Sequence, residues 1–382
     1  MKKILFFMPD NPLKKNAGNK IRALSFLHYF KSRGFQLHFV SEYFWGNWTE
    51  QDVIEFENSG LAFKTSVLKR KASKKNLLHY FIAYKLPEFF RGLLHHSFPD
   101  LATYRLKSAF NNILKREEFD YVFVNYASWA GLIERNPLLK NARTIIDTHD
   151  FLTAQNQHKF NIGKSLNEEI RRLSLFDRVL AISAEEQYIF DQFCKSEVTL
   201  APMMVENPNY MGIPFHERNI DLIYVASKNP HNIASFKWFM KEVYPLLPQS
   251  VSICIIGQIN AYIDGSYPNI TAIPFAEDLD YYYQRAKVAI CPMLSGTGIK
   301  IKVVEALSYH LPVVCNSRGV DGLLNKSNNG CLVSDSPEGF SSYIYVLLND
   351  IKKYQEQSLL AKYTFESGYE QRACYKKLDE LF

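Results

Sequence analysis

The chain has 382 residues, which is too long for one hydrophobic core and suits two α/β domains of roughly 150–200 residues each. Its 47% hydrophobic and 14% aromatic composition excludes a disordered protein. The net charge of +6 is small, and no apolar run approaches the roughly 20 residues of a membrane-spanning helix.

The first half of the chain alternates apolar runs with longer amphipathic stretches. The opening run KKILFFM predicts a strand and not a secretion signal, because it ends at Pro9-Asp10 with no small-residue cleavage site behind it. A turn at Ala17-Gly18-Asn19, a helix closed by Gly34 and the strand QLHFVS follow. Three further strands, YVFVNY, TIIDTH and RVLAIS, predict a parallel sheet covered by helices.

A basic segment, residues 64–116, interrupts this series. Its lysines and arginines far outnumber its two acidic residues, Glu88 and Asp100. Such a patch attracts phosphates, in anionic lipid headgroups, a lipid-pyrophosphate acceptor or nucleic acid. A merely solvated face is the alternative, and nucleic acid is disfavoured because no aromatic–basic recognition motif appears.

A linker then separates two series of the same kind. The stretch APMMVENPNYMGIPFHERN contains three prolines and no periodicity. A new alternation of strands and helices begins with DLIYVAS and continues to PVVCNS. We therefore predict an α/β chain of two Rossmann-like domains facing a central cleft, residues 1–205 and 206–355, with a C-terminal helix over 356–382 that packs on either domain. Such sheets bind phosphorylated ligands beside strand C-termini and helix N-termini.

Residues 288–323 carry the most chemical information. A strand ends at Cys291-Pro292, and the loop Ser295-Gly296-Thr297-Gly298 lets backbone N–H groups approach a phosphate. A helix opens around residues 301–303, and its dipole together with Lys300 and Lys302 favours an anion there. Glu305, expected in the first turn, suits a ribose diol, because one carboxylate accepts from two adjacent hydroxyls.

This stretch resembles the nucleotide-sugar-binding segment of family 4 glycosyltransferases, retaining enzymes of the GT-B fold. The stretches IYVASKNPHNIASFKWFMKEVYPLL and NITAIPFAEDLDYYYQRAKVAI are also similar, and the second passes near the nucleotide base in relatives, which assigns Phe275 to the donor. The N-terminal IDTHDF and FDRVLAISAEE look family-like as well. The resemblance covers nearly the whole chain and is weakest over residues 45–140.

The resemblance implies roles for single residues. Glu305 matches the second glutamate of the family's motif and would hold the ribose, whereas Thr297 replaces the first glutamate, so that the amides of Gly298 and Ile299 would serve near the donor sugar. The family's Arg and Lys positions after the first donor-domain strand hold other residues here. Those positions look like Ser227 and Asn232, with Lys228 one step off. We expect Lys300, Lys302 and Lys228 to supply the missing charge, and a plain surface lysine is the alternative for Lys228.

In the N-terminal half, His149 stands where relatives place a histidine against the transferred sugar. Gly18 stands where relatives let the backbone approach the donor phosphate; a plain helix-entry glycine is the alternative. We assign Tyr126, Trp129 and Asp150 to the acceptor.

No metal is expected. Asp278-Leu279-Asp280 imitates a metal motif of another glycosyltransferase fold, but its place at a helix start predicts a cap. In Asp147-Thr148-His149-Asp150, adjacent strand residues point to opposite faces. The six cysteines are far apart and show no ligand spacing, which fits a reducing cytosol.

By the resemblance, we expect a metal-independent hexosyltransferase that acts with retention, with His149, Lys302 and Glu305 as its central residues. A UDP- or GDP-linked sugar is its co-substrate, no further cofactor is needed, and the acceptor is a glycan or lipid-linked glycan in bacterial-type surface polysaccharide synthesis. The basic segment suggests peripheral binding to the inner face of the membrane by a cytoplasmic protein. A nucleotide-sugar epimerase and a non-catalytic GT-B partner that binds a glycan remain alternatives.

Overall fold

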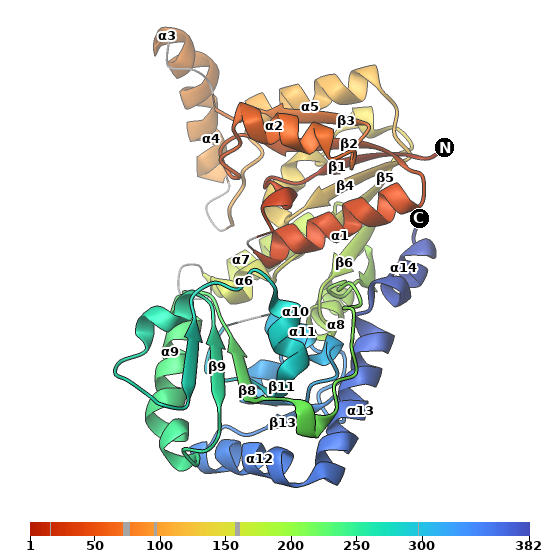
Figure 1. Cartoon of the computed structure of the whole chain (residues 1–382). Coiled ribbons are helices and arrows are strands. Elements are labelled where there is room, and N and C mark those ends of the chain that lie inside the picture. The colour runs from red at the N-terminus through yellow and green to blue at the C-terminus, as the bar shows by residue number, and fades with distance from the viewer. Residues whose placement is uncertain (16, 72–76, 95–97, 157–160, 297) are drawn as a thin grey trace. The chain divides into compact units, whose positions relative to one another are not determined.

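The computed structural model describes residues 1–15, 17–71, 77–94, 98–156, 161–296 and 298–382. The chain divides into two compact units, Met1–Ala201 and Pro202–Phe382. Each unit is a parallel β-sheet with helices packed against it (Figure 1). The predicted α/β architecture of two Rossmann-like domains is confirmed.

The N-terminal domain contains a seven-stranded sheet in the order β3-β2-β1-β4-β5-β6-β7, with every neighbouring pair parallel. Its strands are β1 Lys3–Phe7, β2 Gln36–Glu42, β3 Lys64–Leu68, β4 Tyr121–Asn125, β5 Arg143–Asp147, β6 Arg178–Ala181 and β7 Glu197–Leu200. Its helices are α1 Gly18–Ser32, α2 Glu50–Asn58, α3 Leu77–Tyr80, α4 Leu86–Leu94, α5 Tyr104–Arg116, α6 Leu152–Gln155, α7 Ile162–Leu173 and α8 Ala184–Phe193.

Aromatic packing forms the centre of this domain. Phe6 of β1 stacks on Phe123 of β4 with ring centroids 4.8 Å apart. Phe26 and Phe30 of α1 pack against the same ring, at 5.1 and 6.0 Å. All four side chains are fully buried or nearly so, which explains why these strands appear in the sequence as unbroken apolar runs.

The C-terminal domain contains a six-stranded parallel sheet in the order β10-β9-β8-β11-β12-β13. Its strands are β8 Ile220–Val225, β9 Ile253–Ile256, β10 Ile270–Ile273, β11 Ala286–Cys291, β12 Val313–Cys315 and β13 Cys331–Val333. Its helices are α9 Pro230–Trp238, α10 Leu279–Arg285, α11 Ile301–Ser308, α12 Pro337–Asn349, α13 Ile351–Gly368 and α14 Gln371–Asp379.

The end of the chain is two helices and not the single helix predicted over residues 356–382. The break between α13 and α14 falls at Tyr369–Glu370, where the carbonyl of Tyr369 accepts from the Val205 amide and the Val205 carbonyl accepts from the Gln371 amide. This backbone bridge replaces the helical hydrogen bonds that a continuous helix would need. Both helices belong to the C-terminal unit, and the packing of this segment on the N-terminal domain stays a prediction.

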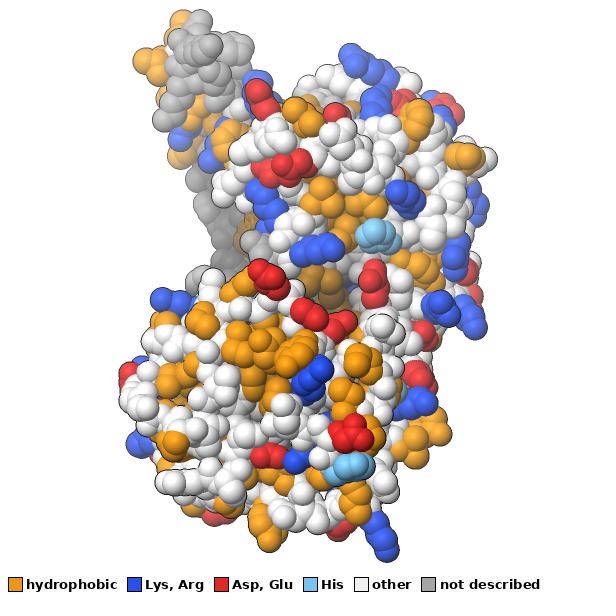
Figure 2. All heavy atoms as spheres, in the orientation of Figure 1, with side chains coloured by type: hydrophobic (Ala, Val, Ile, Leu, Met, Phe, Trp, Pro, Cys, Tyr) orange, Lys and Arg blue, Asp and Glu red, His pale blue; other side chains and the backbone are white. Residues whose placement is uncertain are grey.

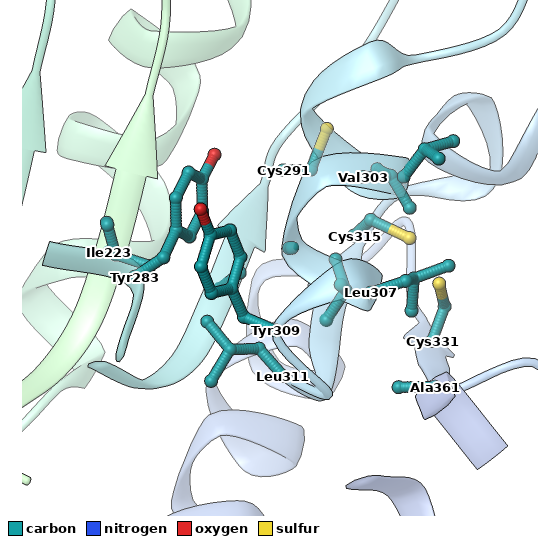
Figure 3. Packing of buried hydrophobic residues seen from close by; sticks show 14 of the residues in the cluster. Ile223, Tyr283, Cys291, Val303, Leu307, Tyr309, Leu311, Cys315, Cys331 and Ala361 are labelled. Atoms are coloured by element: carbon teal, nitrogen blue, oxygen red, sulfur yellow. The ribbon is translucent and has the colours of Figure 1, made fainter. Parts of the chain in front are cut away.

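One face of the C-terminal sheet packs on α11 and α13 through a buried hydrophobic cluster (Figure 3). Cys291, Cys315 and Cys331 lie in this cluster as buried residues, as expected of small apolar side chains. Tyr283 and Tyr309 lie in the same cluster with their rings face to face. The Tyr309 hydroxyl donates to the carboxylate of Asp280.

Candidate functional site

The loops after β8 and β11 leave the C-terminal sheet at neighbouring positions. β8 pairs with both β9 and β11, so the strand order reverses between β8 and β11. Open parallel sheets bind their ligands outside the carboxyl ends of the strands at such a reversal, because the two following helices diverge there. The two sequence segments predicted to bind the donor, residues 226–232 and 292–305, are these two loops and the helix starts behind them.

Side chains from neighbouring elements hold the loop after β11 in place. The Met293 amide donates to Oδ1 of the buried Asn316 at 3.0 Å. The Leu294 amide donates to Oγ of Ser235, on α9, also at 3.0 Å. Two consecutive amides thus donate to side chains on either side of the loop. These hydrogen bonds fix the backbone conformation of the first half of the loop.

Two glycines permit the backbone conformation of the rest of this loop. Gly296 has a φ of +99°, which the L side chains rarely adopt. Gly322 has a φ of +81°, and a Cβ on it would lie 2.7 Å from the N and Cα atoms of Ile299. The backbone of Ile299 is therefore packed directly against Gly322. Thr297, the replacement for the family's first glutamate, lies outside the described residues.

Helix α11 begins at Ile301, and its N-cap residue, Lys300, provides no side-chain cap. The peptide dipoles at this end thus favour an anion, in line with the prediction. Glu305 is the fifth residue of the helix, so the expectation that it lies in the first turn was wrong. The helix begins at Ile301, the first residue of the predicted range 301–303, and this start places Glu305 beyond the first turn.

A hydrogen-bonded chain links Lys302 to the loop after β8. Lys302 Nζ donates to Oδ1 of Asn232 at 2.8 Å, and Nδ2 of Asn232 donates to the carbonyl of Ser227 at 2.9 Å. The ammonium also lies 5.4 Å from the centroid of the Tyr224 ring. The structure therefore brings together residues that the sequence analysis had matched to three separate positions. Burial lowers the pKa of Lys302 from its ordinary value.

Lys300 lies on the other side of the helix start and is buried. Its Nζ donates to the carbonyl of Gly298 at 2.6 Å, and burial lowers its pKa. Both lysines thus donate to neutral oxygens in a low-dielectric setting, where a phosphate oxygen would be a better partner.

Glu305 is a buried carboxylate near Tyr283 and Lys302. Burial raises the pKa of Glu305, while the charge of Lys302 and the hydrogen bond from Tyr283 act in the opposite direction. The carboxylate is thus buried but supported from two sides. It retains acceptor capacity for further donors, since an ionised carboxylate offers about four lone-pair sites.

The two remaining donor candidates lie on the surface. Phe275 is 79% exposed, in the segment between β10 and α10. Lys228 is exposed, with Nζ 5.5 Å from the centroid of the Tyr262 ring. Neither contacts the Lys302–Asn232–Ser227 chain through a described hydrogen bond, and their donor-binding roles stay predictions.

In the N-terminal domain, β5 ends at Asp147, so His149 lies two residues beyond the strand and not at its end as expected. It has a φ of 59°, is buried, and its ring stacks on Tyr126 with centroids 4.4 Å apart. Nε2 lies 2.7 Å from Oδ1 of Asn125, whose Nδ2 donates to the carbonyl of Phe7. Because the Asn125 oxygen must then accept, Nε2 of His149 carries the proton.

Burial lowers the pKa of His149 to about 4. The neighbouring carboxylate of Asp147 raises this pKa, as expected, but burial lowers it by more. The Asp147 carboxylate is already engaged: Arg22 of α1 donates to it from Nε at 2.8 Å and from Nη2 at 2.7 Å, and both side chains are fully buried. His149 is therefore a neutral, fixed hydrogen-bonding group at neutral pH.

Three residues were assigned to the acceptor, and the assignment of Trp129 was wrong. It lies in a wholly buried 3-10 helix, residues 127–132, and packs on Phe7 at 5.2 Å, so it is a core residue with no surface to offer. Tyr126 is buried with a φ of 70°, and burial raises its pKa far above the ordinary value. Asp150 is half-buried, and burial together with Glu169 raises its pKa to about 6.

Gly18 is the first residue of α1, in the loop after β1. Strand order in the N-terminal sheet reverses between β1 and β4, so this loop occupies the ligand-binding position of that sheet. The approach of Gly18 to a ligand stays a prediction.

The structure confirms the predicted helix cap in the first of the two discounted motifs. Asp278 is the N-cap of α10, and its side chain accepts from the Tyr281 amide. Across the described ranges, no three His, Cys, Asp or Glu side chains gather as ligands for a metal ion. None of the helices described here is both long and apolar enough to cross a bilayer.

Sequence reasoning missed the residues that support the site. Arg22 lies at the start of the apolar run of α1, two residues after Lys20, and the sequence did not mark it as buried. Tyr283 and Asn316 gave no local signal, because their partners are distant in sequence.

The structure resembles solved structures over the whole chain. Sucrose-phosphate synthase from Thermosynechococcus elongatus superposes with a TM-score of 0.69 at 14% identity, covering 100% of this chain and 98% of that one. Anabaena HepE, solved in complex with UDP, gives a TM-score of 0.70 at 12% identity, covering 100% and 99%. A Klebsiella pneumoniae relative, an uncharacterized 44.6 kDa protein in the cps region, is 20% identical over 99% of both chains.

Two Rossmann-like domains arranged in sequence, with this likeness across the full chain, define the GT-B fold of glycosyltransferases. Residues 219–350, which carry the Lys302–Asn232–Ser227 chain and Glu305, match the family of glycosyl transferases group 1. The chain is a glycosyltransferase, and the segment that matches that group lies within its C-terminal domain.

Proposed function

We propose that this chain transfers a hexosyl group from a UDP- or GDP-linked sugar to a glycan or lipid-linked glycan acceptor in the synthesis of a surface polysaccharide. One observation carries the donor half of the proposal: Lys300, Lys302 and Glu305 come together at the start of α11, beside the reversal of the sheet. Cations and a helix N-terminus suit a diphosphate, and a supported carboxylate suits a ribose diol.

The comparisons support the substrate classes. HepE has been solved with UDP, with UDP and glucose, and with UDP-glucose. TarM, a structure with a TM-score of 0.62 to this chain, has been solved with UDP and α-GlcNAc-glycerol. The gene region of the Klebsiella pneumoniae relative, named cps, supports a role in a surface polysaccharide.

In the proposed reaction, the bond between the anomeric carbon and the β-phosphate oxygen breaks as the acceptor hydroxyl attacks from the same face. Negative charge grows on the departing diphosphate, where Lys300, Lys302 and the amide dipoles of α11 stabilise it. The departing phosphate takes the proton of the acceptor hydroxyl. His149, neutral and held through Nε2, would orient a hydroxyl of the sugar rather than exchange protons. No metal ion is needed in this scheme.

Replacement of Glu305 by Gln tests the donor site. Loss of a carboxylate that accepts from two hydroxyls should weaken UDP or GDP binding by about 10–100-fold, the effect of charge-assisted hydrogen bonds. Isothermal titration measures it, and Glu277→Gln, an exposed change in the same domain, is the matched control. Equal affinities in Glu305→Gln and wild type would refute the ribose role.

The reaction class is tested with the wild-type chain and a panel of nucleotide sugars. A transferase releases the nucleoside diphosphate only when an acceptor is present, apart from slow hydrolysis. Conversion of donor without nucleotide release would instead identify an epimerase, and nucleotide binding without any turnover would identify a non-catalytic partner.

We further propose that the chain is cytoplasmic and binds the inner face of the membrane through residues 77–94, the projecting segment. This segment runs through α3, a π-helical turn (residues 81–85) and α4, and Figure 1 shows it standing away from the N-terminal sheet. Figure 2 shows hydrophobic side chains on its surface. Its large exposed apolar residues are Leu77, Leu78, Phe81, Ile82, Leu86, Phe89 and Phe90.

Lysines accompany this apolar surface. Lys85 is exposed on the projecting segment itself, and Lys69 and Lys71 lie just before it, over the rings of Tyr43 and Phe44. Apolar rings flanked by lysines suit a bilayer with anionic headgroups. Lys74 and Lys75 of the basic segment lie outside the described residues.

Flotation with phosphatidylglycerol-containing vesicles tests this docking. Phe81→Ser/Phe89→Ser/Phe90→Ser should abolish flotation while leaving UDP affinity unchanged, because these rings are exposed. Equal recovery of wild type on neutral phosphatidylcholine vesicles would argue against the anionic preference.

A further inference from the structure

Helix α9 contacts the loop after β11 through two residues that lie one turn apart. Ser235 accepts a hydrogen bond from the Leu294 amide at 3.0 Å, and its Oγ donates to the carbonyl of His231 at 2.8 Å. Nδ1 of His231 lies 2.8 Å from Oγ of Ser295, the next residue of the loop. Two consecutive loop residues are therefore hydrogen-bonded to one face of α9, because positions i and i+4 share a face of a helix.

The two contacts differ in burial. Ser235 is fully buried, so the hydrogen bond that it accepts belongs to the core of the domain. His231 and Ser295 are both exposed to solvent. A hydrogen bond between exposed groups adds little to the free energy of unfolding, because water competes for both partners. The contact between His231 and Ser295 therefore fixes the position of the loop without being needed for the fold.

The imidazole of His231 also packs on the backbone of Gly296. A Cβ built on this glycine would lie 3.4 Å from Cγ of His231, and the φ of +99° already disfavours any side chain there. Glycine has the largest conformational freedom of all residues, so a loop with a glycine at this point needs an outside contact to keep one conformation. The ring of His231 supplies that contact.

The backbone amides of this loop form two groups. Those of Met293 and Leu294 donate to side chains of the domain. Those of Ser295 and Gly296 donate to no atom of the residues that the structure describes, and both residues have solvent-accessible surface. Consecutive N–H groups without a protein acceptor can bind the oxygens of a phosphate. They lie in the loop that leads to the start of α11, which also favours an anion.

We propose that His231 is a positioning residue for the donor diphosphate, which holds the amides of Ser295 and Gly296 in place to donate to a phosphate oxygen. The inference rests on the proposed function, which puts the diphosphate at the start of α11. A loop that is already fixed loses less conformational entropy when the ligand binds. The hydrogen bond from His231 to Ser295 thus raises affinity without any contact between His231 and the ligand.

Isothermal titration with UDP and with uridine tests the inference. His231→Phe keeps a ring over Gly296 but loses Nδ1, and Ser295→Ala removes the other partner of the hydrogen bond. Each variant should lower UDP affinity about fivefold, the effect of one hydrogen bond, and leave uridine affinity unchanged because uridine has no phosphate. The double variant should bind UDP no more weakly than either single variant, because all three lack the same hydrogen bond.

A conservative replacement separates the hydrogen bond from the imidazole itself. In His231→Asn, an amide atom bonded to Cγ takes the place of Nδ1, and UDP affinity should stay within about twofold of wild type. The matched control is His216→Phe, which changes an exposed histidine elsewhere in the same domain. Melting temperatures should be unchanged in all these variants, because the replaced side chains are exposed.

Unchanged UDP affinity in the single variants would overturn the inference alone, and so would equal losses for UDP and uridine. Losses that add in the double variant, or a His231→Asn variant as weak as His231→Phe, would do the same. Wild type that binds neither UDP nor GDP would overturn the proposed function, and the inference with it.

Discussion

At the carboxyl end of β5, the buried guanidinium of Arg22 meets the buried carboxylate of Asp147 through two hydrogen bonds. At the carboxyl end of β11, the buried ammonium of Lys302 meets the neutral amide oxygen of Asn232. The two domains share a fold and place a cation beside the same edge of the sheet. The first cation is paired with a carboxylate through direct hydrogen bonds, whereas the second donates to a neutral oxygen and interacts with the Glu305 carboxylate through its charge alone.

The difference explains which domain is suited to an anionic ligand. A buried ion pair with two good hydrogen bonds has little to gain from a phosphate. A lysine held by a neutral oxygen in a low-dielectric setting gains the full attraction of a charge-assisted bond when phosphate arrives. At these two strand ends, the N-terminal domain thus presents fixed neutral groups to a ligand, and the C-terminal domain presents a positive charge.

The largest expected effect comes from breaking the ion pair of the N-terminal domain. Arg22→Met leaves Asp147 as an uncompensated buried charge and should lower the free energy of unfolding of that domain by about 3–5 kcal/mol. Urea unfolding measures the loss, and UDP affinity should be retained by any chain that remains folded. Adding Asp147→Leu should restore most of the stability; a double variant as weak as Arg22→Met would show that the charge is not the cause.

The second expected effect concerns Glu186, at the start of α8. Burial, with the charge of Asp150 nearby, raises the pKa of Glu186 to about 7, so the folded state keeps a proton that the unfolded state loses above about pH 4.5. Its stabilising contribution is therefore complete below that pH and lost as the pH rises to 7. Glu186→Gln should remove this loss, and should be more stable than wild type at pH 8 by about 2–3 kcal/mol relative to their difference at pH 4.5.

Urea unfolding of both proteins at the two pH values gives this difference. The exposed change Glu185→Gln, next to it on α8, should show no such pH dependence. A difference between wild type and Glu186→Gln that does not vary with pH would mean that Glu186 is ionised in the folded protein.

The smallest effect is in the C-terminal domain. Lys302→Met keeps the length of the side chain but removes its charge, and should weaken UDP binding about tenfold, the effect of one charge-assisted hydrogen bond. Uridine has no phosphate but keeps the ribose assigned to Glu305, whose charge Lys302 supports, so its affinity should fall less than that of UDP. Isothermal titration of both ligands checks this, with the exposed Lys241→Met as control. An equal loss for uridine would indicate a distorted pocket and not a missing charge.

The sequence was sufficient to predict the strands that are buried on both faces, because these are continuous apolar runs. It did not reveal β3, β7 or β13, which lie at the ends of the two sheets and are only partly buried or very short. The donor segment was predicted in the right domain, and α11 begins within the predicted range of residues 301–303. It begins at the first residue of that range, so Glu305 lies beyond the first turn.

Pairings between distant residues were beyond sequence reasoning. Arg22 and Asp147 are 125 positions apart, and nothing local to either residue points to the other. Trp129 was assigned to the acceptor, and only its tertiary packing on Phe7 shows that it belongs to the core. Residue type and local pattern thus predicted the candidates, and packing decided which of them remain accessible.

Gly322 has a practical meaning for protein engineering. Since its missing side chain leaves the space that the backbone of Ile299 fills, residues 292–300 cannot be transplanted alone into another enzyme to change donor preference. A chimera that carries this loop without the turn around residue 322 would meet a Cβ there and shift the grafted backbone, so the two segments form one exchangeable cassette.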